Sequence, residues 1–178
     1  MSVVDPLDPG RNLAALGLSL ARVARRLELP ASALLAPVPA VSAWSVGEHL
    51  FHLVLACDLS LRNATSLARD EGLLLREPED KNPEALALLR RGRFPRGVAR
   101  APRFVTPPRR IDLALLGRLL AEVRAAREHL AGDLAALSAA PRTIPHQLLG
   151  DLDAREWLRF ARAHTAHHLL IVREIGRR

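Results

Sequence analysis

The sequence predicts an all-α protein, a four-helix bundle with a long crossover between the second and third helices. Three observations support this prediction. Apolar residues recur at helical spacing in four separate segments, strand-like alternation is nearly absent, and no internal repeat is visible. The length of 178 residues suits a single domain, residues 1–178, with a sizeable core, and the one cysteine, Cys57, excludes an intramolecular disulfide.

Apolar faces and capping residues predict the first two helices. One helical face over about 11–28 carries Leu13, Leu16, Leu20, Val23 and Leu27. The proline-containing stretch "LPASALLAPVPA" ends this helix. Ser45 and Glu48 have capping-box spacing, and an apolar run follows them to about Ala68, which predicts the second helix.

Two further helices are predicted after the crossover. The third, over about 109–138, has one apolar face with Leu116, Leu119, Val123, Leu130, Leu134 and Leu137. Asp153 and Glu156 form a second capping-box spacing, which starts the fourth helix, about 153–176. Prolines at positions 78, 83, 95, 102, 107 and 108 exclude one continuous helix in the crossover, although 83–91 can form a short one. Connections of this length are often functional.

The crossover accounts for the net positive charge of the chain. The chain has a formal net charge of +7, while residues 81–110 alone contain nine basic residues against one acidic residue, Glu84. Arginines at 90, 91, 93, 96, 100 and 103 can neutralise phosphates, which makes a basic binding module one hypothesis. Only Phe94 and Phe104 interleave with them, so stacking platforms for single strands are missing, and nucleic acid is not the expected partner. We favour the interpretation that these arginines are exposed to solvent and reflect the arginine-rich composition of the chain. A third possibility is that one or two of them contact an anionic cosubstrate.

The expected compartment is the cytoplasm. The N-terminal "MSVVDPLDPGRNL" lacks the basic and apolar regions of a signal peptide, and no apolar run approaches the roughly eighteen residues of a membrane span. A soluble cytoplasmic protein is therefore predicted.

Three of the seven histidines stand together in "HTAHH". Steps of three and four place His164 and His168 on the inward stripe of the fourth helix, with His167 at its edge. Imidazoles four residues apart can point at a common ion, and a third ligand can come from His49 or His52 on the second helix. Periodicity neither chooses between these two nor excludes both. Three imidazoles around an ion leave an open position, as in catalytic sites.

Several other site types are excluded by their motifs. A zincin needs a glutamate directly after the first histidine, where this chain has Thr165. There is no GxSxG nucleophile elbow, no glycine-rich phosphate loop and no tyrosine. An open tri-histidine ion can lower the pKa of a bound water or bind a thiol as thiolate.

The segments "WSVGEHLFHL" and "HQLLGDLDAREWLRFARAHTAHHLLIVREI" resemble the DinB-like (DNA-damage-inducible) superfamily, whose short members carry W-S-x-x-E-x-x-x-H-L and H-x-x-H-H-L patterns. The resemblance covers two of the four helices in the right order. It implies a bundle that holds a divalent metal, zinc or nickel, through three histidines, and it selects His52 over His49 as the partner of His164 and His168. It also implies a homodimer. Relatives use low-molecular-weight thiols such as bacillithiol or mycothiol for S-transfer.

The predicted function is therefore a metal-dependent enzyme that transfers a thiol to a small electrophile, with metal-dependent hydrolysis as a weaker alternative. The third hypothesis is a non-catalytic binding or interaction protein with a vestigial metal site. His167 is either a base or outer hydrogen-bond partner, or a packed edge histidine. His49 is expected to orient His52 or to contact the neighbouring helix, and His146 is expected to form a turn. We expect His129 to be exposed, Cys57 to be a thiol in the core, and Trp44 and Trp157 to pack at helix starts.

Overall fold

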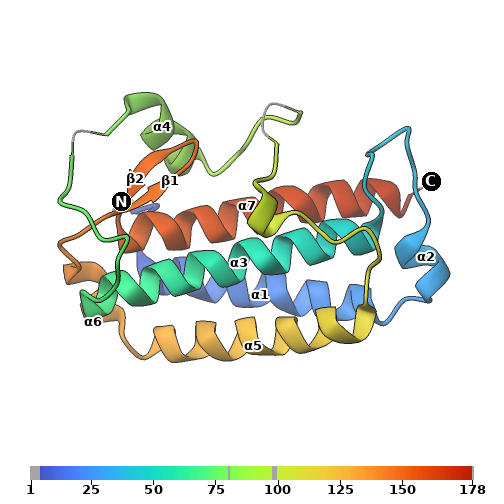
Figure 1. Ribbon diagram of the computed structural model, residues 1–178, viewed down its shortest axis with the longest axis horizontal. Coiled ribbons are helices and arrows are strands. Elements are labelled where there is room, and N and C mark those ends of the chain that lie inside the picture. The colour runs from blue at the N-terminus through green and yellow to red at the C-terminus, as the bar shows by residue number, and fades with distance from the viewer. Residues whose placement is uncertain (1–4, 80, 98–99, 178) are drawn as a thin grey trace.

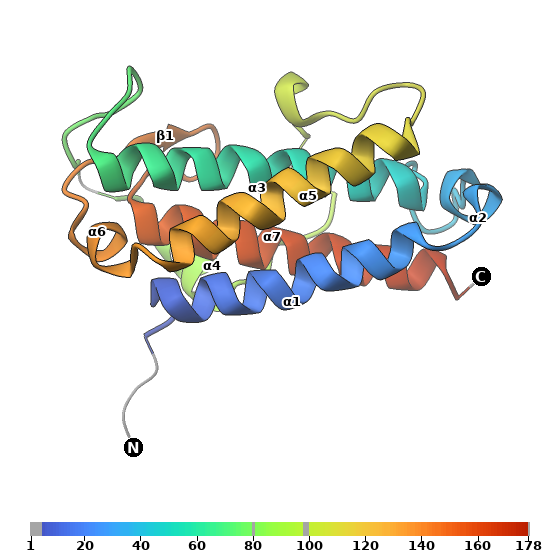
Figure 2. The same ribbon diagram turned by 90° about the horizontal axis from the view of Figure 1, so that it is seen from below.

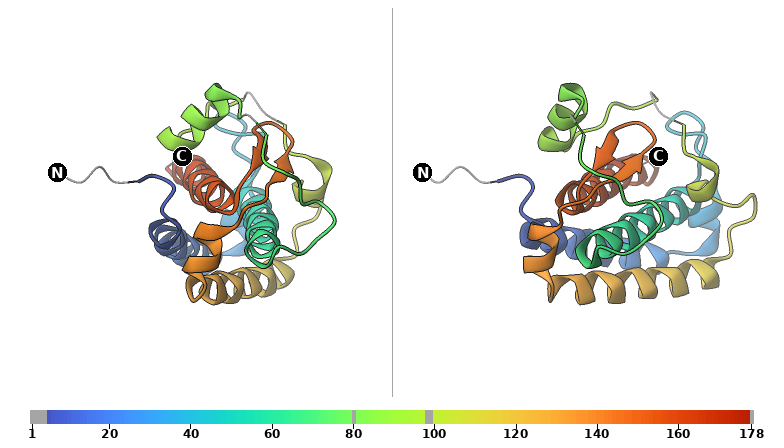
Figure 3. Two further views of the ribbon diagram at one scale, coloured as in Figure 1. Left: turned by 90° about the vertical axis from the view of Figure 1, so that its left-hand side faces the viewer. Right: turned by 60° about the vertical axis from the view of Figure 1, so that its left-hand side comes forward.

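Four long helices form a bundle in the computed structural model, which describes residues 5–79, 81–97 and 100–177. α7 packs on α3 and α1, and α5 packs on the same two helices from the opposite side. Figure 3 shows this arrangement along the helix axes in its left view. The all-α bundle predicted from the sequence is confirmed. The four helices are α1 (Pro9–Leu27), α3 (Val46–Arg69), α5 (Leu113–Ala131) and α7 (Ala154–Ile175).

The direction of the helices explains the long crossover. α1 and α7 run one way, while α3 and α5 run the other way (Figure 1 and Figure 2). Because α3 and α5 are consecutive but parallel, the chain between them must return along the length of the bundle. Residues 70–112 make this return and contain α4 (Pro83–Arg91) and the short 3-10 helix η1 (Arg103–Val105). α4 packs on α7 and η1 packs on α3, so the crossover covers the α3–α7 face.

Capping boxes begin both helices that carry the candidate site. The Ser45 hydroxyl accepts from the Glu48 amide at 3.3 Å, and the Glu48 carboxylate accepts from the Ser45 amide at 2.7 Å. Asp153 and Glu156 make the equivalent pair at the start of α7, at 2.9 and 2.8 Å. Both predicted helix starts are confirmed. These reciprocal bonds satisfy amide groups that the first helical turn leaves unpaired.

The prediction of one helix over 109–138 is wrong. α5 begins only at Leu113, where Asp112 caps it by accepting from the Leu115 amide. It ends at Ala131, and a separate short helix, α6 (Leu134–Ala139), follows Gly132. Glycine and aspartate both favour helix ends, so the apolar periodicity continues across a break in the backbone.

Besides η1, two short elements were not predicted. α2 (Ala31–Leu35) forms inside the proline-rich stretch, where it buries Leu34 completely. An antiparallel hairpin of β1 (Ile144–His146) and β2 (Gly150–Leu152) precedes α7. Both elements are too short to stand without packing on the bundle.

The interior of the bundle also contains the only thiol. The sulfur of Cys57 lies 3.0 Å from the Thr165 hydroxyl, between α3 and α7. Burial raises the pKa of Cys57 to about 12, so the thiol stays protonated and unreactive at neutral pH. The predicted core role of Cys57 is confirmed. Among the described residues, no helix combines the length and the hydropathy that a membrane crossing requires.

Candidate metal centre

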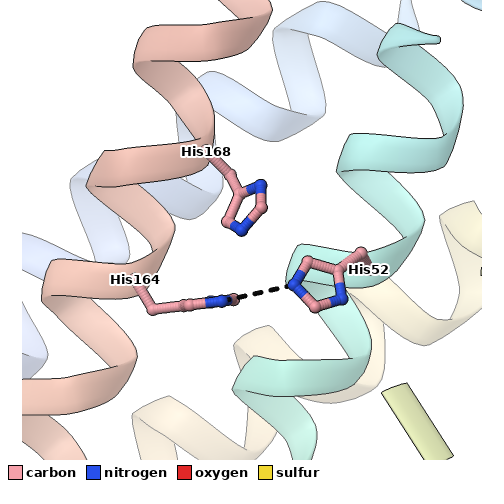
Figure 4. A group of neighbouring side chains, drawn as sticks. All are labelled: His52, His164 and His168. Carbon is pink, nitrogen blue, oxygen red and sulfur yellow. Dashed lines mark hydrogen bonds between the residues drawn. The ribbon is translucent and has the colours of Figure 1, made fainter. Parts of the chain in front are cut away.

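Three histidines from two helices meet between α3 and α7 (Figure 4). His52 comes from the first half of α3, and His164 and His168 lie one turn apart on α7. One ring nitrogen of each lies within 4.8 Å of those of the other two, so the group can hold a metal ion. The structure therefore brings together the three residues that the sequence motif selects.

The nitrogen separations fit a tetrahedral ion. Zinc–imidazole bonds of about 2.0–2.1 Å at tetrahedral angles place two ligand nitrogens roughly 3.3 Å apart. The Nε2 atoms of His52 and His164 are already 3.2 Å apart. The ligand nitrogen of His168 lies within 4.8 Å of the other two. The donor set suits zinc or another borderline divalent metal, because such metals favour imidazole ligands.

A backbone carbonyl fixes the tautomer of His52. Its Nδ1 lies 2.8 Å from the carbonyl oxygen of Val105 in η1. A carbonyl only accepts, so Nδ1 carries the proton and Nε2 keeps a lone pair that faces His164. The crossover thus orients one of the candidate ligands.

A second chain of hydrogen bonds orients His168. Its Nδ1 lies 3.0 Å from Nδ1 of His49, and Nε2 of His49 lies 2.8 Å from the hydroxyl of Ser42. The other ring nitrogen of His168 points toward His52 and His164 (Figure 4). His49 therefore hydrogen-bonds to His168 of the neighbouring helix, which confirms the second of its two expected roles. The partner that orients His52 is the carbonyl of Val105.

Aromatic rings enclose the three histidines. The ring of Trp44 lies 5.0 Å from that of His52, centre to centre, and 6.5 Å from that of His168. Phe160 stacks on His164, with the two ring centres 5.1 Å apart. Trp44 was expected only to pack at a helix start, but it forms a wall of the centre. Such apolar walls limit water and strengthen electrostatic interactions inside the site.

The site histidines are neutral at physiological pH. Burial lowers the pKa of His49 to about 4, and it also lowers the pKa of His52. The pKa values of His164 and His168 are lowered, first by burial and then by the positive charge that neighbouring histidines would carry. Metal binding requires unprotonated imidazoles, so these shifts keep the lone pairs available.

Two further histidines border the centre. His167 is half-buried, with its ring 6.4 Å from Phe94 of the crossover, and it does not belong to the metal-binding group. Nδ1 of His146 accepts from the amides of Leu148 and Leu149 at 3.2 Å, which closes the turn of the hairpin. The turn predicted for His146 is confirmed.

Outside the centre, two more predictions hold. His129 is exposed on α5, as expected. Trp157 is buried near the start of α7, where its indole N–H donates to the carbonyl of Ile144 at 3.3 Å. The packing role expected of Trp157 is confirmed.

Three contributors to the site were missed by sequence reasoning. They are the carbonyl of Val105, the hydroxyl of Ser42 and the ring of Phe160. Sequence reasoning also did not single out Arg96, which pairs with Glu174 of α7 at 2.6 Å. Every residue has a backbone carbonyl, so the residue type cannot show which carbonyl contacts a histidine. Ser42 precedes the predicted helix in an irregular loop. The position of Arg96 among many arginines gave no signal that separated it from the others.

One known family matches most of the chain. The sequence profile of the DinB superfamily matches residues 15–172. No curated protein and no solved structure matches the chain. The matched region reaches from α1 to α7 and includes both segments that supply the histidines. The chain therefore belongs to the DinB superfamily.

Proposed function

We propose that this protein is a divalent-metal-dependent enzyme that binds a small thiol at an ion held by His52, His164 and His168 and transfers its sulfur to an electrophilic carbon. One observation carries the proposal. Three neutral imidazoles converge, while the fourth nearby ring, His49, hydrogen-bonds to His168 instead of joining the group. Three ligands leave a position for a substrate, whereas structural zinc sites use four.

A bound zinc or nickel ion would lower the pKa of a coordinated thiol, so that the thiolate is available at neutral pH. The chain supplies the remaining features. The carbonyl of Val105 and the ring of His49 hold His52 and His168 in place, and the rings of Trp44 and Phe160 restrict water.

In the transfer itself, a carbon–sulfur bond forms as the leaving group departs with its bonding electron pair. The thiol loses its proton on binding. His167 lies at the edge of the centre, beside His168, and burial lowers its pKa, so it is neutral and able to accept that proton. Metal-dependent hydrolysis would use water at the same open position, and the thiol use of similar proteins favours S-transfer.

Turnover by tag-free, zinc- or nickel-loaded protein tests the proposal. Low-molecular-weight thiols are offered with 1-chloro-2,4-dinitrobenzene, and thioether formation is followed. We expect metal-dependent turnover that is lost in His52→Ala and retained in His129→Ala, a change to an exposed histidine of α5. Hydrolysis of ester or amide substrates without any thiol transfer would establish the alternative instead.

A further inference from the structure

An open cavity of about 560 Å³ lies beside the C-terminal half of α7. Its lining consists of Ala40, Val41, Arg96, Glu174 and Arg177. We propose that this cavity is the subsite for a carboxylate carried by the thiol substrate, and that Arg96 binds that carboxylate. The inference rests on the proposed thiol chemistry at the histidine centre.

One lining residue of the cavity is a sequence neighbour of the network that holds the centre. Val41 directly precedes Ser42, whose hydroxyl is hydrogen-bonded to His49 and through it to His168. Glu174 follows His168 by six residues on α7, which separates the two by about 9 Å along the helix axis and by roughly a third of a turn around it. The proposed substrate is therefore a flexible thiol with its carboxylate at the far end.

Arg96 is held at the cavity by the crossover. The ring of Phe94, two residues earlier, packs against Phe160 at 5.8 Å and His167 at 6.4 Å. This contact anchors the crossover on α7 next to the centre. The guanidinium of Arg96 donates to the carboxylate of Glu174 at 2.6 Å.

The partner of Arg96 already has the chemistry of the proposed ligand. A guanidinium pairs with a carboxylate in a fork geometry, and Glu174 provides such a carboxylate from within the protein. The two side chains are 48% and 45% exposed, and ion pairs with that exposure contribute little to stability. A substrate carboxylate can therefore replace Glu174, while Arg177 adds a second positive charge to the cavity wall.

An ordinary surface ion pair and a substrate subsite differ in what Glu174 does. In a subsite, Glu174 competes with the ligand for Arg96, so its removal strengthens binding of the ligand carboxylate. In an ordinary ion pair, neither Arg96→Gln nor Glu174→Gln changes the affinity for a thiol. Opposite effects of the two substitutions are therefore the signature of the subsite.

Cobalt(II)-substituted protein allows this test without turnover, because a coordinated thiolate gives a charge-transfer absorption band. The probes are 6-mercaptohexanoate and its neutral amide, which differ only in charge. We expect the wild type to bind the carboxylate roughly tenfold more tightly than the amide, as one charge-assisted hydrogen bond provides. Arg96→Gln removes this preference and Glu174→Gln increases it. Arg173→Gln, an exposed change outside the cavity lining, leaves it unchanged.

The outcomes separate the two proposals. Clear bands with equal affinity for both probes in the wild type, or a preference that survives Arg96→Gln, overturn the carboxylate subsite alone. If cobalt binds but neither probe produces a band, the thiol chemistry is wrong and the subsite falls with it. Cobalt absorption in each variant shows that the centre has formed.

Discussion

The hydrogen bond between the Nδ1 atoms of His49 and His168 decides which nitrogen of His168 can serve as a ligand. If His168 binds a metal through Nε2, its Nδ1 carries a proton and donates it to His49. Nε2 of His49 then donates to the hydroxyl of Ser42, 2.8 Å away. Outer hydrogen bonds of this kind fix ring orientation and raise ligand basicity.

Loss of the His49 acceptor is expected to weaken metal binding. In His49→Leu the proton on Nδ1 of His168 has no partner, so zinc affinity should fall about 10–100-fold. His49→Asn keeps an oxygen close to the position of Nδ1 and should lose less. Competition with a chromophoric chelator at pH 7 measures both affinities. An unchanged affinity in His49→Leu would show that His168 needs no such partner.

At the residue scale, sequence reasoning reached part of the centre. The spacing of His164 and His168 placed them together because the helix repeat alone determines their relation. The same spacing argument could not distinguish His49 from His52. The two residues are three apart, so they lie on nearly the same face of the helix, and both are buried. Their different roles come from Ser42 and from Val105, 53 positions beyond His52. Only the family motif distinguished them.

At the scale of elements, the β1–β2 hairpin depends on a neutral histidine. Burial lowers the pKa of His146 to about 4, while the unfolded chain keeps an ordinary value near 6.5. Between these two values the unfolded state takes up a proton that the folded state does not. Neutral His146 therefore makes its full contribution to the free energy of unfolding above pH 6.5. This contribution is lost progressively as the pH falls to about 4.

His146→Asn should flatten this pH dependence. Its side-chain oxygen can accept from the amides of Leu148 and Leu149, as Nδ1 of His146 does, but it does not titrate. We expect the slope of unfolding free energy between pH 4.5 and 6.5 to decrease by up to about 1.4 kcal/mol per pH unit. Urea unfolding of metal-free protein measures it. Equal slopes in the two proteins would show that the lowered pKa of His146 does not cause this pH dependence.

Docking of α4 on α7 depends on Gly92 and Arg159. Gly92 has a φ of 62°, and a Cβ there would lie 2.4 Å from Nη2 of Arg159. The Arg159 guanidinium donates to the carbonyls of Leu89 and Arg90 at the end of α4, at 2.7 and 2.8 Å. A side chain at position 92 would therefore displace the group that binds α4.

Gly92→Ala should release α4 locally. We expect about 1–3 kcal/mol less protection of the α4 amides in hydrogen exchange, with α3 little affected. Gly97→Ala is the matched control, because Gly97 has a similar φ of 71° but no atom within 4 Å of the added Cβ. Equal effects of the two substitutions would assign the loss to backbone strain and not to Arg159.

Element prediction succeeded where local chemistry decides and failed where tertiary contacts do. Capping boxes located the starts of α3 and α7, because these bonds form within four residues. α2 and the hairpin were missed because they are held from outside: Leu34 is fully buried, and Thr143, which directly precedes β1, pairs with Arg76 of the crossover. Such contacts are not visible in a window of sequence.

For the whole molecule, the parallel course of α3 and α5 places the crossover over the face that carries the histidines (Figure 1). Most of its arginines are exposed, as the solvated interpretation predicted. The crossover nevertheless contributes the carbonyl of Val105 to the centre, and its Arg96 pairs with Glu174 of α7. Near its start, Lys81 pairs with the buried Glu156 at the beginning of α7. Topology, and not composition, gives this segment its role.

The most direct test of the account is the metal content of protein purified without an affinity tag. Mass spectrometry of the metals should find about one zinc or nickel ion per chain in the wild type and in His129→Ala. His52→Ala, His164→Ala and His168→Ala should lose it while circular dichroism shows an intact helical fold. Stoichiometric metal that survives all three substitutions would contradict the proposed centre.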